Sequence, residues 1–597
     1  MMRKLFFVGA LALVTVLTGC GGSSGSNGGN GGGGGGGNSV SVSIAPTNAT
    51  VALNGTQQFS ATVTPSSAAQ TVTWSVSAGA NTTCSAPACG TVDGNGLYTA
   101  PSALPTGNQV KVTATSTQDT SKSSTATVTL VSTQNSRISG TYTFRFDGFN
   151  SAGGVLVVGN IKTDGAGTVQ GGSEVISTNT GPTASRTITG GSYSVGTDGR
   201  GDMVLNTSSG DTFCYVFAVG STTLDNPLFV EFNHVTAPIA CTGAGMGSST
   251  HGSGVMNLAS TSAFGKTALN QPYVFELNGF DAAGKRASYV GRFVADGAGT
   301  ITSWTLDRND NGTASGQLSG SGTYTINNNT GAGTITLTGG PTLTVYIKDS
   351  DELALSIADP IATNPSAEGV AESQDTMPAY DLTTFNGTSV FYATGVGTNP
   401  NTGWVVAGLA TTNGAGSVSG TFDQNNGGSI MMNASLGTGT YTPTGSGRYT
   451  ISLNGVPYVM YGITTNKAFL LDQASPQVLS GLVEPQAANP SANTIGGTFV
   501  ETSHQVSTSA DQNTVAALTL NNSTGAISGM QDSTDGTENP NQSVTGSYTV
   551  SSNGRGNFNF TAPAASTGIV YVINQSKFIA IPLDATNAAP QVLVDVR

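Results

Sequence analysis

The sequence predicts an all-β protein made of several small domains in tandem. Charged residues are only 9% of the 597 residues, whereas glycine alone accounts for 83 of them. Thr and Val favour strands while Gly and Asn favour tight turns, so this composition indicates many short strands joined by hairpins. A chain of this length is too long for a single hydrophobic core and has room for about four to six domains.

The first residues are typical of an export signal. Two cations precede an apolar run over residues 5–17, which matches the charged and hydrophobic regions of a signal peptide. The run ends in Leu17-Thr18-Gly19-Cys20, and this ending resembles the lipobox of bacterial lipoproteins. The resemblance implies that residues 1–19 are removed as a lipoprotein signal peptide and that Cys20 is acylated. Two or more acyl chains hold a protein on a membrane stably.

Residues 20–38 are predicted to form a flexible tether behind the lipid. After Cys20 the segment contains only Gly, Ser and Asn, and such a segment cannot bury enough apolar area to become ordered. Its mean reach as a random coil is about 20–25 Å. We therefore expect a lipid-anchored protein outside the cytoplasm. Gly21 takes the place where, in the lipoprotein family, Asp marks inner-membrane retention, so the outer membrane or cell surface is expected.

The charge and the cysteines narrow the expected partners and chemistry. A net charge of −13 argues against a nucleic-acid partner, because such proteins need a basic face. Four of the five cysteines lie beyond the tether, and an oxidising compartment predicts two disulfides, Cys84–Cys89 and Cys214–Cys241. A thiolate metal site is the rival interpretation for the first pair, but no histidine lies near it.

Residues 39–132 are predicted to form a β-sandwich. Six or seven short strands with period-two alternation follow one another at close spacing, which is typical of a sandwich. The opening Val42-Ser-Ile-Ala-Pro46, Thr73-Trp74-Ser75-Val76, residues 96–101 (Gly-Leu-Tyr-Thr-Ala-Pro) and residues 112–116 (Val-Thr-Ala-Thr-Ser) resemble a bacterial Ig-like domain of group 2. The resemblance implies an adhesion or spacer module without catalytic residues, in which Trp74 anchors the core.

The remaining chain contains four copies of one unit, at residues 138–258, 268–375, 384–486 and 494–597. Each copy opens on a strand and continues through an Asp/Asn-Gly-Ala-Gly type of turn, which is degenerate in the fourth copy. A Gly-Ser/Thr-Tyr strand follows, and a second glycine turn comes directly after it. The tyrosines of this later strand are Tyr193, Tyr324, Tyr441 and Tyr548.

About eight antiparallel strands per copy can close as an up-and-down barrel or pack as two sheets. We favour the barrel, because the meander shows no long crossover and closure removes exposed strand edges. Each unit is similar to avidin and lipocalin barrels in architecture only, since no ligand motif of either family is present. Alternation predicts that Tyr142, Phe144 and Phe146 point into the first barrel, as Tyr273 and Phe275 do in the second.

No constellation of catalytic or metal-ligating residues stands out. His234, His251 and His504 show no zinc-binding spacing and are interpreted as isolated imidazoles on loops. Residues 307–312 match the first half of a Ca²⁺ loop, but Leu318 stands where the bidentate Glu is required. Related acidic turns occur near Asp423 and Asp532, and a polar hairpin explains all three better than Ca²⁺. We therefore expect no metal and no cofactor.

The expected function is non-enzymatic: a surface protein for adhesion, display or spacing, attached to the membrane by lipid and facing a surface protein or glycan. The alternative is a binding protein whose barrel interiors or mouths hold a small apolar molecule or a glycan. The large inward side chains favour filled interiors, and the cavity volume of each barrel distinguishes the two.

Replacing Cys20 by Ala should release the protein from membranes, because the expected anchor is an acyl chain and not a peptide segment. The fraction of protein pelleting with membranes, and incorporation of a fatty-acid analogue, measure this directly. Failure of the analogue to label the wild-type protein would contradict the lipid anchor.

Overall fold

The computed structural model describes residues 39–597 apart from residues 54, 81, 102–103, 106, 132–133, 180–182, 221–226, 233–249, 377–378, 398–401, 492–493, 505–507 and 588. Strands dominate this part of the chain, and its helices are four short 3₁₀ segments. None of the described helices is long and apolar enough to cross a membrane. The all-β fold class predicted from composition is confirmed.

The N-terminal domain is the predicted Ig-like sandwich. One sheet has the order β2-β9-β8-β5, a second pairs β1 with β4, and a third has the order β3-β7-β6. The strands are β1 (Ser41–Ala45), β2 (Asn48–Ala52), β3 (Thr56–Gln58), β4 (Ser60–Thr64), β5 (Val72–Ala78), β6 (Thr91–Val92), β7 (Leu97–Thr99), β8 (Gln109–Ser116) and β9 (Ser123–Val131). Phe59 and Tyr98 are fully buried in the core, and the half-buried Trp74 packs against it.

Each of the four C-terminal units is a closed antiparallel barrel. Barrel 1 contains β10 (Ser139–Asn150), β11 (Gly153–Asp164), β12 (Thr168–Thr178), β13 (Ala184–Val195), β14 (Arg200–Thr207), β15 (Thr212–Ala218), β16 (Leu228–Phe232) and β17 (His251–Leu258). Barrel 2 contains β18 (Pro272–Phe280), β19 (Arg286–Ala295), β20 (Thr300–Asp310), β21 (Thr313–Ile326), β22 (Ala332–Leu337), β23 (Thr342–Ile347), β24 (Glu352–Ile357) and β25 (Ser366–Ser373).

Barrel 3 has its fourth strand divided in two. It contains β26 (Asn386–Val396), β27 (Gly403–Asn413), β28 (Ser417–Asn426), β29 (Ser429–Ser435), β30 (Gly439–Gly445), β31 (Arg448–Leu453), β32 (Val456–Thr464), β33 (Lys467–Asp472) and β34 (Val478–Pro485). Both β29 and β30 pair with β28, and pairing of β27 with β28 closes the barrel.

Barrel 4 contains β35 (Gly497–His504), β36 (Asn513–Asn521), β37 (Ala526–Thr534), β38 (Glu538–Val550), β39 (Arg555–Ala562), β40 (Ser566–Asn574), β41 (Lys577–Pro582) and β42 (Val592–Val596). In every barrel the first strand pairs with both the second and the last, as Tyr142 does with Ile161 and Leu258. The barrel interpretation is therefore confirmed over the sandwich alternative.

The recurring tyrosine closes one end of each barrel. Tyr193, Tyr324, Tyr441 and Tyr548 each donate their hydroxyl to backbone carbonyls of the segment before the first strand. That segment also inserts one buried apolar residue, which is Ile138, Leu269, Phe385 or Ile495. We call this segment, with its buried apolar residue, the plug of the barrel. The tyrosine of the Gly-x-Tyr pattern therefore holds the plug in place.

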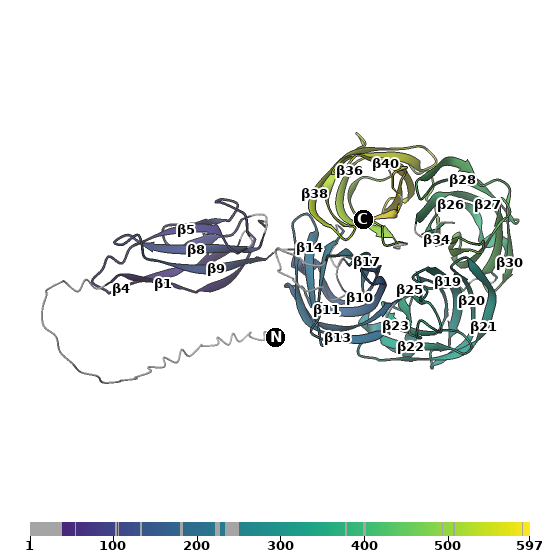
Figure 1. Cartoon of the computed structure of the whole chain (residues 1–597), viewed down its shortest axis with the longest axis horizontal. Coiled ribbons are helices and arrows are strands. Elements are labelled where there is room, and N and C mark those ends of the chain that lie inside the picture. The colour runs from purple at the N-terminus through teal and green to yellow at the C-terminus, as the bar shows by residue number, and fades with distance from the viewer. Residues whose placement is uncertain are drawn as a thin grey trace, which may run out of the picture.

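The four barrels pack side by side as a closed ring, with the Ig-like domain as a separate body (Figure 1). Barrel 1 contacts barrel 2 through β11 and β24, barrel 2 contacts barrel 3 through β19 and β33, and barrel 3 contacts barrel 4 through β26 and β40. The ring closes because β36 of barrel 4 returns to contact β15 of barrel 1. The barrels follow one another in tandem along the chain, as predicted, and the contact between the fourth and the first turns the series into a ring.

An acid of the third strand binds an arginine of the next barrel at three of the four junctions. Arg448 donates Nε and Nη2 to the carboxylate of Asp307, both at 2.7 Å, and Tyr461 adds its hydroxyl at 2.7 Å. Arg555 and Tyr571 bind Asp423 in the same way. Asp532 accepts from Arg200 at 2.6 Å, which joins barrel 4 to barrel 1.

The junction between barrels 1 and 2 replaces this ion pair with apolar contact. Register places Val175 where the other barrels have the acid, and Ala332 where they have the arginine. Val175 packs with Tyr346, the counterpart of Tyr461, and Ala332 packs against the same cluster. A paired charge and a matched apolar pair are both stable when buried, whereas a single charge is not. At this junction both positions are apolar.

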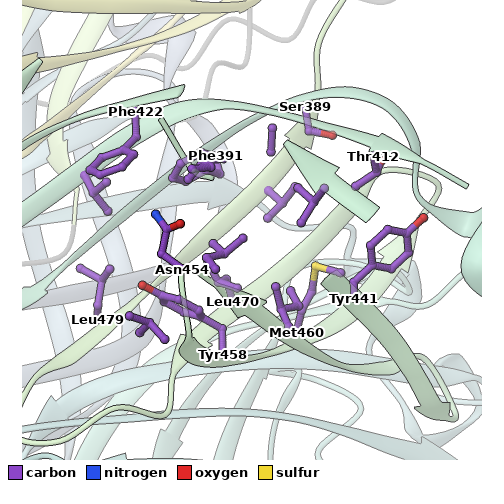
Figure 2. Close-up of a pocket in the computed structure, with 18 of the residues that line it drawn as sticks. Ser389, Phe391, Thr412, Phe422, Tyr441, Asn454, Tyr458, Met460, Leu470 and Leu479 are labelled. Atoms are coloured by element: carbon purple, nitrogen blue, oxygen red, sulfur yellow. The ribbon is translucent and has the colours of Figure 1, made fainter. Parts of the chain in front are cut away.

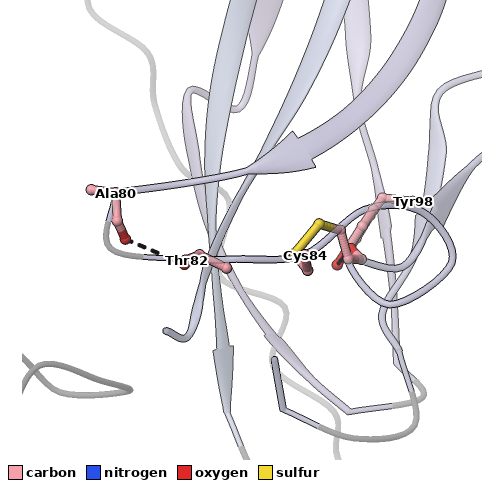
Figure 3. Close-up of a disulfide and its surroundings, with 5 residues drawn as sticks. Ala80, Thr82, Cys84 and Tyr98 are labelled. Carbon is pink, nitrogen blue, oxygen red and sulfur yellow. Dashed lines mark hydrogen bonds between the residues drawn. A yellow bond between two sulfur atoms is a disulfide. The ribbon is translucent and has the colours of Figure 1, made fainter. Parts of the chain in front are cut away.

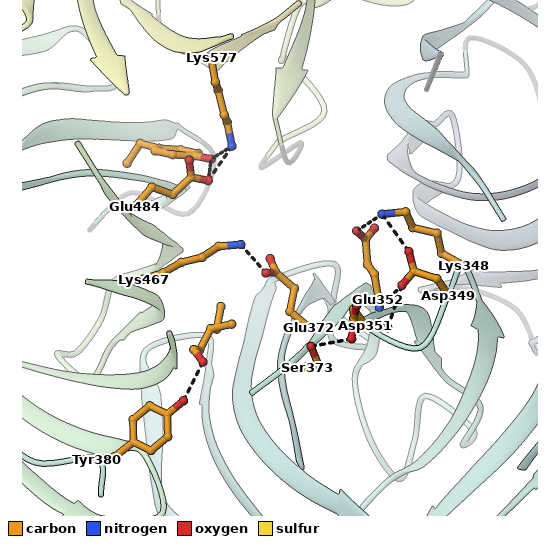
Figure 4. Close-up of polar contacts among 12 residues, drawn as sticks. Lys348, Asp349, Asp351, Glu352, Glu372, Ser373, Tyr380, Lys467, Glu484 and Lys577 are labelled. Carbon is orange, nitrogen blue, oxygen red and sulfur yellow. Dashed lines mark hydrogen bonds and ion pairs between the residues drawn. The ribbon is translucent and has the colours of Figure 1, made fainter. Parts of the chain in front are cut away.

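A second ion pair recurs between the last strand of one barrel and the next barrel (Figure 4). Lys467 binds Glu372, and Lys577 binds Glu484 at 2.6 Å while also contacting the hydroxyl of Tyr392 at 3.0 Å. These residues lie at matching positions of the β25–β33 and β34–β41 contacts. Apolar side chains of three barrels, including Val290, Val405 and Ile569, form one continuous cluster beside them.

Replacing Arg448 by Ala should lower the unfolding free energy by about 3–5 kcal/mol, because it leaves the buried Asp307 charge without its cation. The midpoint of urea unfolding measures the loss, and Lys162→Ala, which removes an exposed lysine of barrel 1, is the control. Equal midpoints for the two variants would show that the junction pair contributes nothing.

Candidate functional site

The interior of barrel 3 encloses an apolar cavity of about 190 Å³ (Figure 2). All eight strands that close the barrel contribute to its lining. Two further cavities, one inside barrel 4 and one between barrels 1 and 2, have volumes of only about 20 and 10 Å³. Since roughly 10–15 Å³ accommodates a single water, the barrel 3 cavity is large enough for an organic molecule.

Two small side chains explain why barrel 3 is hollow. Ser389 of β26 lies directly opposite Ala410 of β27. In barrel 2 the same pair is Tyr273 and Phe293, whose stacked rings have centroids 5.3 Å apart. The corresponding pairs are Tyr142–Ile161 in barrel 1 and Phe499–Leu518 in barrel 4. Barrel 3 therefore lacks at this level the large side chains that fill the other three.

The plug forms a closed apolar floor. Tyr441 donates its hydroxyl to the carbonyls of Leu382 and Phe385, at 2.9 and 2.8 Å. The ring of Phe385 lies edge-on to Tyr441 and to Tyr449, with centroid distances of 6.3 and 5.0 Å. The 3₁₀ segment η4 (Leu382–Thr384) holds the plug in place. A long chain-like molecule cannot pass through this end.

Polar side chains also line the opposite end of the cavity. Figure 2 shows Asn454 and Tyr458 there, far from Tyr441. Asn454 has a φ of 50° in the tight turn between β31 and β32, a conformation that asparagine tolerates better than most residues. Gln424 lies on the lining strand β28 and accepts from the indole of Trp404 at 3.3 Å. A bound molecule would meet these amides and hydroxyls at the mouth.

Among the residues that the structure describes, none that lines the cavity is charged or a histidine. Its polar side chains are hydroxyls and amides, and Ser389 is already bonded to the carbonyl of Asn466 at 3.2 Å. Burial raises the pKa of the Tyr458 hydroxyl above its ordinary value, so this group stays neutral. The site can exclude water and make dispersion contacts with an uncharged molecule, and it offers no counter-charge to an ion.

The structure locates some of the predicted cysteines. The Cys84–Cys89 disulfide is present in the Ig-like domain, where Tyr98 donates its hydroxyl to the carbonyl of Cys89 at 2.9 Å (Figure 3). Cys214 is buried in β15 and is disulfide-bonded. Cys20 and Cys241 lie outside the described residues, so the lipid site and the second pairing stay predictions.

Two histidines occupy other places than predicted. His251 lies in β17 beside the ring of Phe149, and His504 lies in β35 beside Tyr392. His251 is buried and His504 is half-buried, and both lie on strands and not on loops. Burial holds the pKa of His504 well below its usual value, and the charges of Arg145, Lys577 and Arg286 lower it further. His234 lies outside the described residues.

The half-motif for Ca²⁺ serves the barrel junction. Asp307 accepts from Arg448 and Tyr461 of barrel 3, and the amide of Asn309 donates to carbonyls of Asp472 and Gln477, both at 2.9 Å. Within the described residues, no group of three or more His, Cys, Asp and Glu side chains is placed to hold a metal. The interpretation of these residues as a polar hairpin did not include a contact with the next barrel. A partner in another repeat leaves no local signal in the sequence.

Sequence reasoning also missed the cavity residues, although a signal was present. The opening strands of the repeats align Tyr142, Tyr273, Ser389 and Phe499. Only the third copy has a small polar residue in this column. This difference between the copies marks the third barrel as the hollow one.

Barrel 4 has a different interior, with two buried carboxyls. Glu501 takes the inward position of Phe144 and is paired directly with Asp595 of β42. Both lie against the cavity of about 20 Å³. Burial raises the pKa of Glu501 to about 7, and burial together with the neighbouring Glu501 raises that of Asp595 well above its ordinary value. Such a pair titrates as one coupled unit.

Comparison with known proteins supports the Ig-like assignment of the first domain. Residues 40–128 match the model of the bacterial Ig-like domain (group 2), which fits an extracellular or surface protein. No curated protein matches the sequence. Among solved structures, the chain is similar to the isotype 1 transferrin binding protein B from serogroup B Neisseria meningitidis, at 11% identity and a TM-score of 0.16, over 64% of this chain and 83% of that one. A TM-score this low carries no argument.

Stability should fall as the pH rises from about 5 to 7.5. A carboxyl whose pKa is raised by folding stabilises the folded state below its ordinary pKa of 4.5, and this contribution is lost as the pH rises through about 7. The loss is on the order of 1.4 kcal/mol per pH unit for each such carboxyl across that window. Glu174 and Asp472, whose pKa burial also raises to about 7, act in the same direction.

Urea-unfolding midpoints at several pH values measure this dependence, and Glu501→Gln should reduce its slope. The matched variant is Asp535→Asn, which removes an exposed carboxyl of the same barrel. A midpoint that rises with pH in the wild-type protein would contradict the assignment.

Proposed function

We propose that the protein is a non-enzymatic, lipid-anchored surface protein whose third barrel binds a small, uncharged, apolar molecule. The observation that carries this proposal is the cavity of about 190 Å³ inside barrel 3. For comparison, an engineered cavity of roughly 150 Å³ lined by Leu, Ile and Phe stays dry and binds benzene. The barrel 3 cavity has a similar lining and slightly more room.

The rest of the chain supplies attachment and a frame. The acylated Cys20 and the tether of residues 20–38 would hold the protein on the outer membrane or cell surface, and the Ig-like domain would separate the ring from the lipid. The filled interiors of barrels 1 and 2, with Tyr142, Phe144 and Tyr273 all buried, suit a structural role. A net charge of −13 supports a partner other than nucleic acid.

Adhesion, display or spacing is the second candidate function. It is favoured by the Ig-like domain at residues 40–128, because this domain class is found in adhesion and spacer modules of surface proteins. In that case the partner is a surface protein or glycan and the barrel 3 cavity has no ligand. The two functions are separated by whether blocking the cavity changes anything besides stability.

Toluene at saturation should raise the thermal unfolding midpoint of the full chain, because a ligand that binds only the folded state stabilises it. Ala410→Phe, which places in barrel 3 the ring that Phe293 supplies in barrel 2, should abolish this increase while keeping the fold. Val158→Ala, at an outward position between barrels 1 and 2, is the control that leaves the cavity open. An equal toluene effect in wild type and Ala410→Phe would place the binding elsewhere and overturn the proposal.

A further inference from the structure

Two features of the wall around the empty position in barrel 3 recur around a tyrosine ring in barrels 1 and 2. Barrels 1, 2 and 3 each have a phenylalanine on the first strand packed over a glycine of the second strand. A Cβ on Gly159, Gly291 or Gly408 would come within 2.7, 2.5 or 2.6 Å of the corresponding phenylalanine ring. The plug tyrosine below the position is also common to the three barrels.

The side chain that fills the position is a phenol in barrels 1 and 2 and the ring of Phe499 in barrel 4. Tyr273 is fully buried, and its hydroxyl donates to the carbonyl of Ser350 in the turn between β23 and β24, at 2.6 Å. In barrel 3 the matching turn, between β32 and β33, presents the carbonyl of Asn466, which accepts from Ser389 at 3.2 Å. The side chain of Asn466 bonds the backbone of Asn386 and so fixes this turn. A hydroxyl acceptor thus remains where the tyrosine is missing.

From this internal comparison we propose that the ligand of barrel 3 is a phenol: a single aromatic ring with one uncharged hydroxyl. Its ring would take the place of the Tyr273 ring of barrel 2 against Phe391 and Tyr441, and its hydroxyl would bond Ser389 or the Asn466 carbonyl. This inference rests on the proposed function, since it names the class of molecule that the same cavity binds.

Other ligand classes fit the cavity less well. A carboxylate or ammonium group would lose its hydration without gaining a counter-charge, because the described part of the lining contains no charged side chain. A long acyl chain is stopped by the floor of Phe385, Tyr441 and Tyr449. A flat ring gains edge-to-face contacts with the aromatic side chains of the wall, which a saturated ring of similar size does not.

The test measures binding of four probes to the full chain by calorimetry: p-cresol, toluene, 4-methylcyclohexanol and decanoate. We expect p-cresol to bind most tightly, and toluene to bind about fivefold more weakly, because it lacks the one hydroxyl that forms a hydrogen bond. Tighter binding of 4-methylcyclohexanol or decanoate than of p-cresol would overturn the phenol assignment and leave the proposed function standing. Absence of binding by all four probes would overturn both.

Two variants at one position separate cavity filling from simple damage. Ser389→Tyr restores the barrel 2 side chain, so it should abolish p-cresol binding and raise the thermal midpoint. Ser389→Ala keeps the cavity open, so it should keep p-cresol binding, with the Asn466 carbonyl free to accept the hydroxyl. If Ser389→Tyr fails to fold, competition of p-cresol with toluene in the wild-type protein shows whether the two probes share one site. Unchanged p-cresol binding in folded Ser389→Tyr, or no competition between the two probes, would overturn the assignment.

Discussion

Contact between neighbouring barrels is the constraint on which the ring depends. A lone barrel buries one face of each strand and leaves the other face to water, whereas these barrels bury both faces of many strands. On β10, for example, the outward-facing Thr143 and Asp147 are as well buried as the inward-facing Phe146. Buried polar groups must find partners, and Thr143 finds one by donating to the carbonyl of Ile347 in the next barrel at 3.0 Å. The Asp–Arg pairs at three junctions follow the same requirement.

The ring also explains how barrel 3 can remain hollow. At about 24 cal/mol per Å³, a void of 190 Å³ costs on the order of 4–5 kcal/mol relative to a filled barrel. That is a large part of the stability of a typical domain. Barrel 3, however, is held on both sides, by Asp307–Arg448 toward barrel 2 and by Asp423–Arg555 toward barrel 4. A bound molecule would recover part of the cost of the void, which couples ligand occupancy to stability.

Two kinds of buried carboxyl occur in the ring: those bonded to an arginine, and the pair formed by Glu501 and Asp595. Asp307 and Asp423 are each bonded to an arginine of the next barrel, whereas Glu501 and Asp595 face each other inside an apolar barrel and keep protons more tightly than in water. Barrel 4 also provides the C-terminal strand β42, which closes the barrel on β35. Its closure is therefore sensitive to a change in pH.

The sequence by itself determined the local structure of this protein. Period-two alternation, glycine turns and a recurring Gly-x-Tyr pattern are local signals, and they were sufficient for the all-β class, for the four repeated units and for the inward direction of Phe144 and its counterparts. They favoured closed barrels over two packed sheets without deciding between them, and the Ig-like assignment came from a family resemblance. Only the tertiary structure decided which barrel lies beside which, because the contact between Arg200 and Asp532 joins residues far apart in the chain. The hollow interior of barrel 3 lies between these cases: Ser389 and Ala410 are visible in the sequence, but a void is a property of all the side chains that meet across a closed barrel. Packing, and not pattern, determines whether small residues leave a space or are covered by a neighbour.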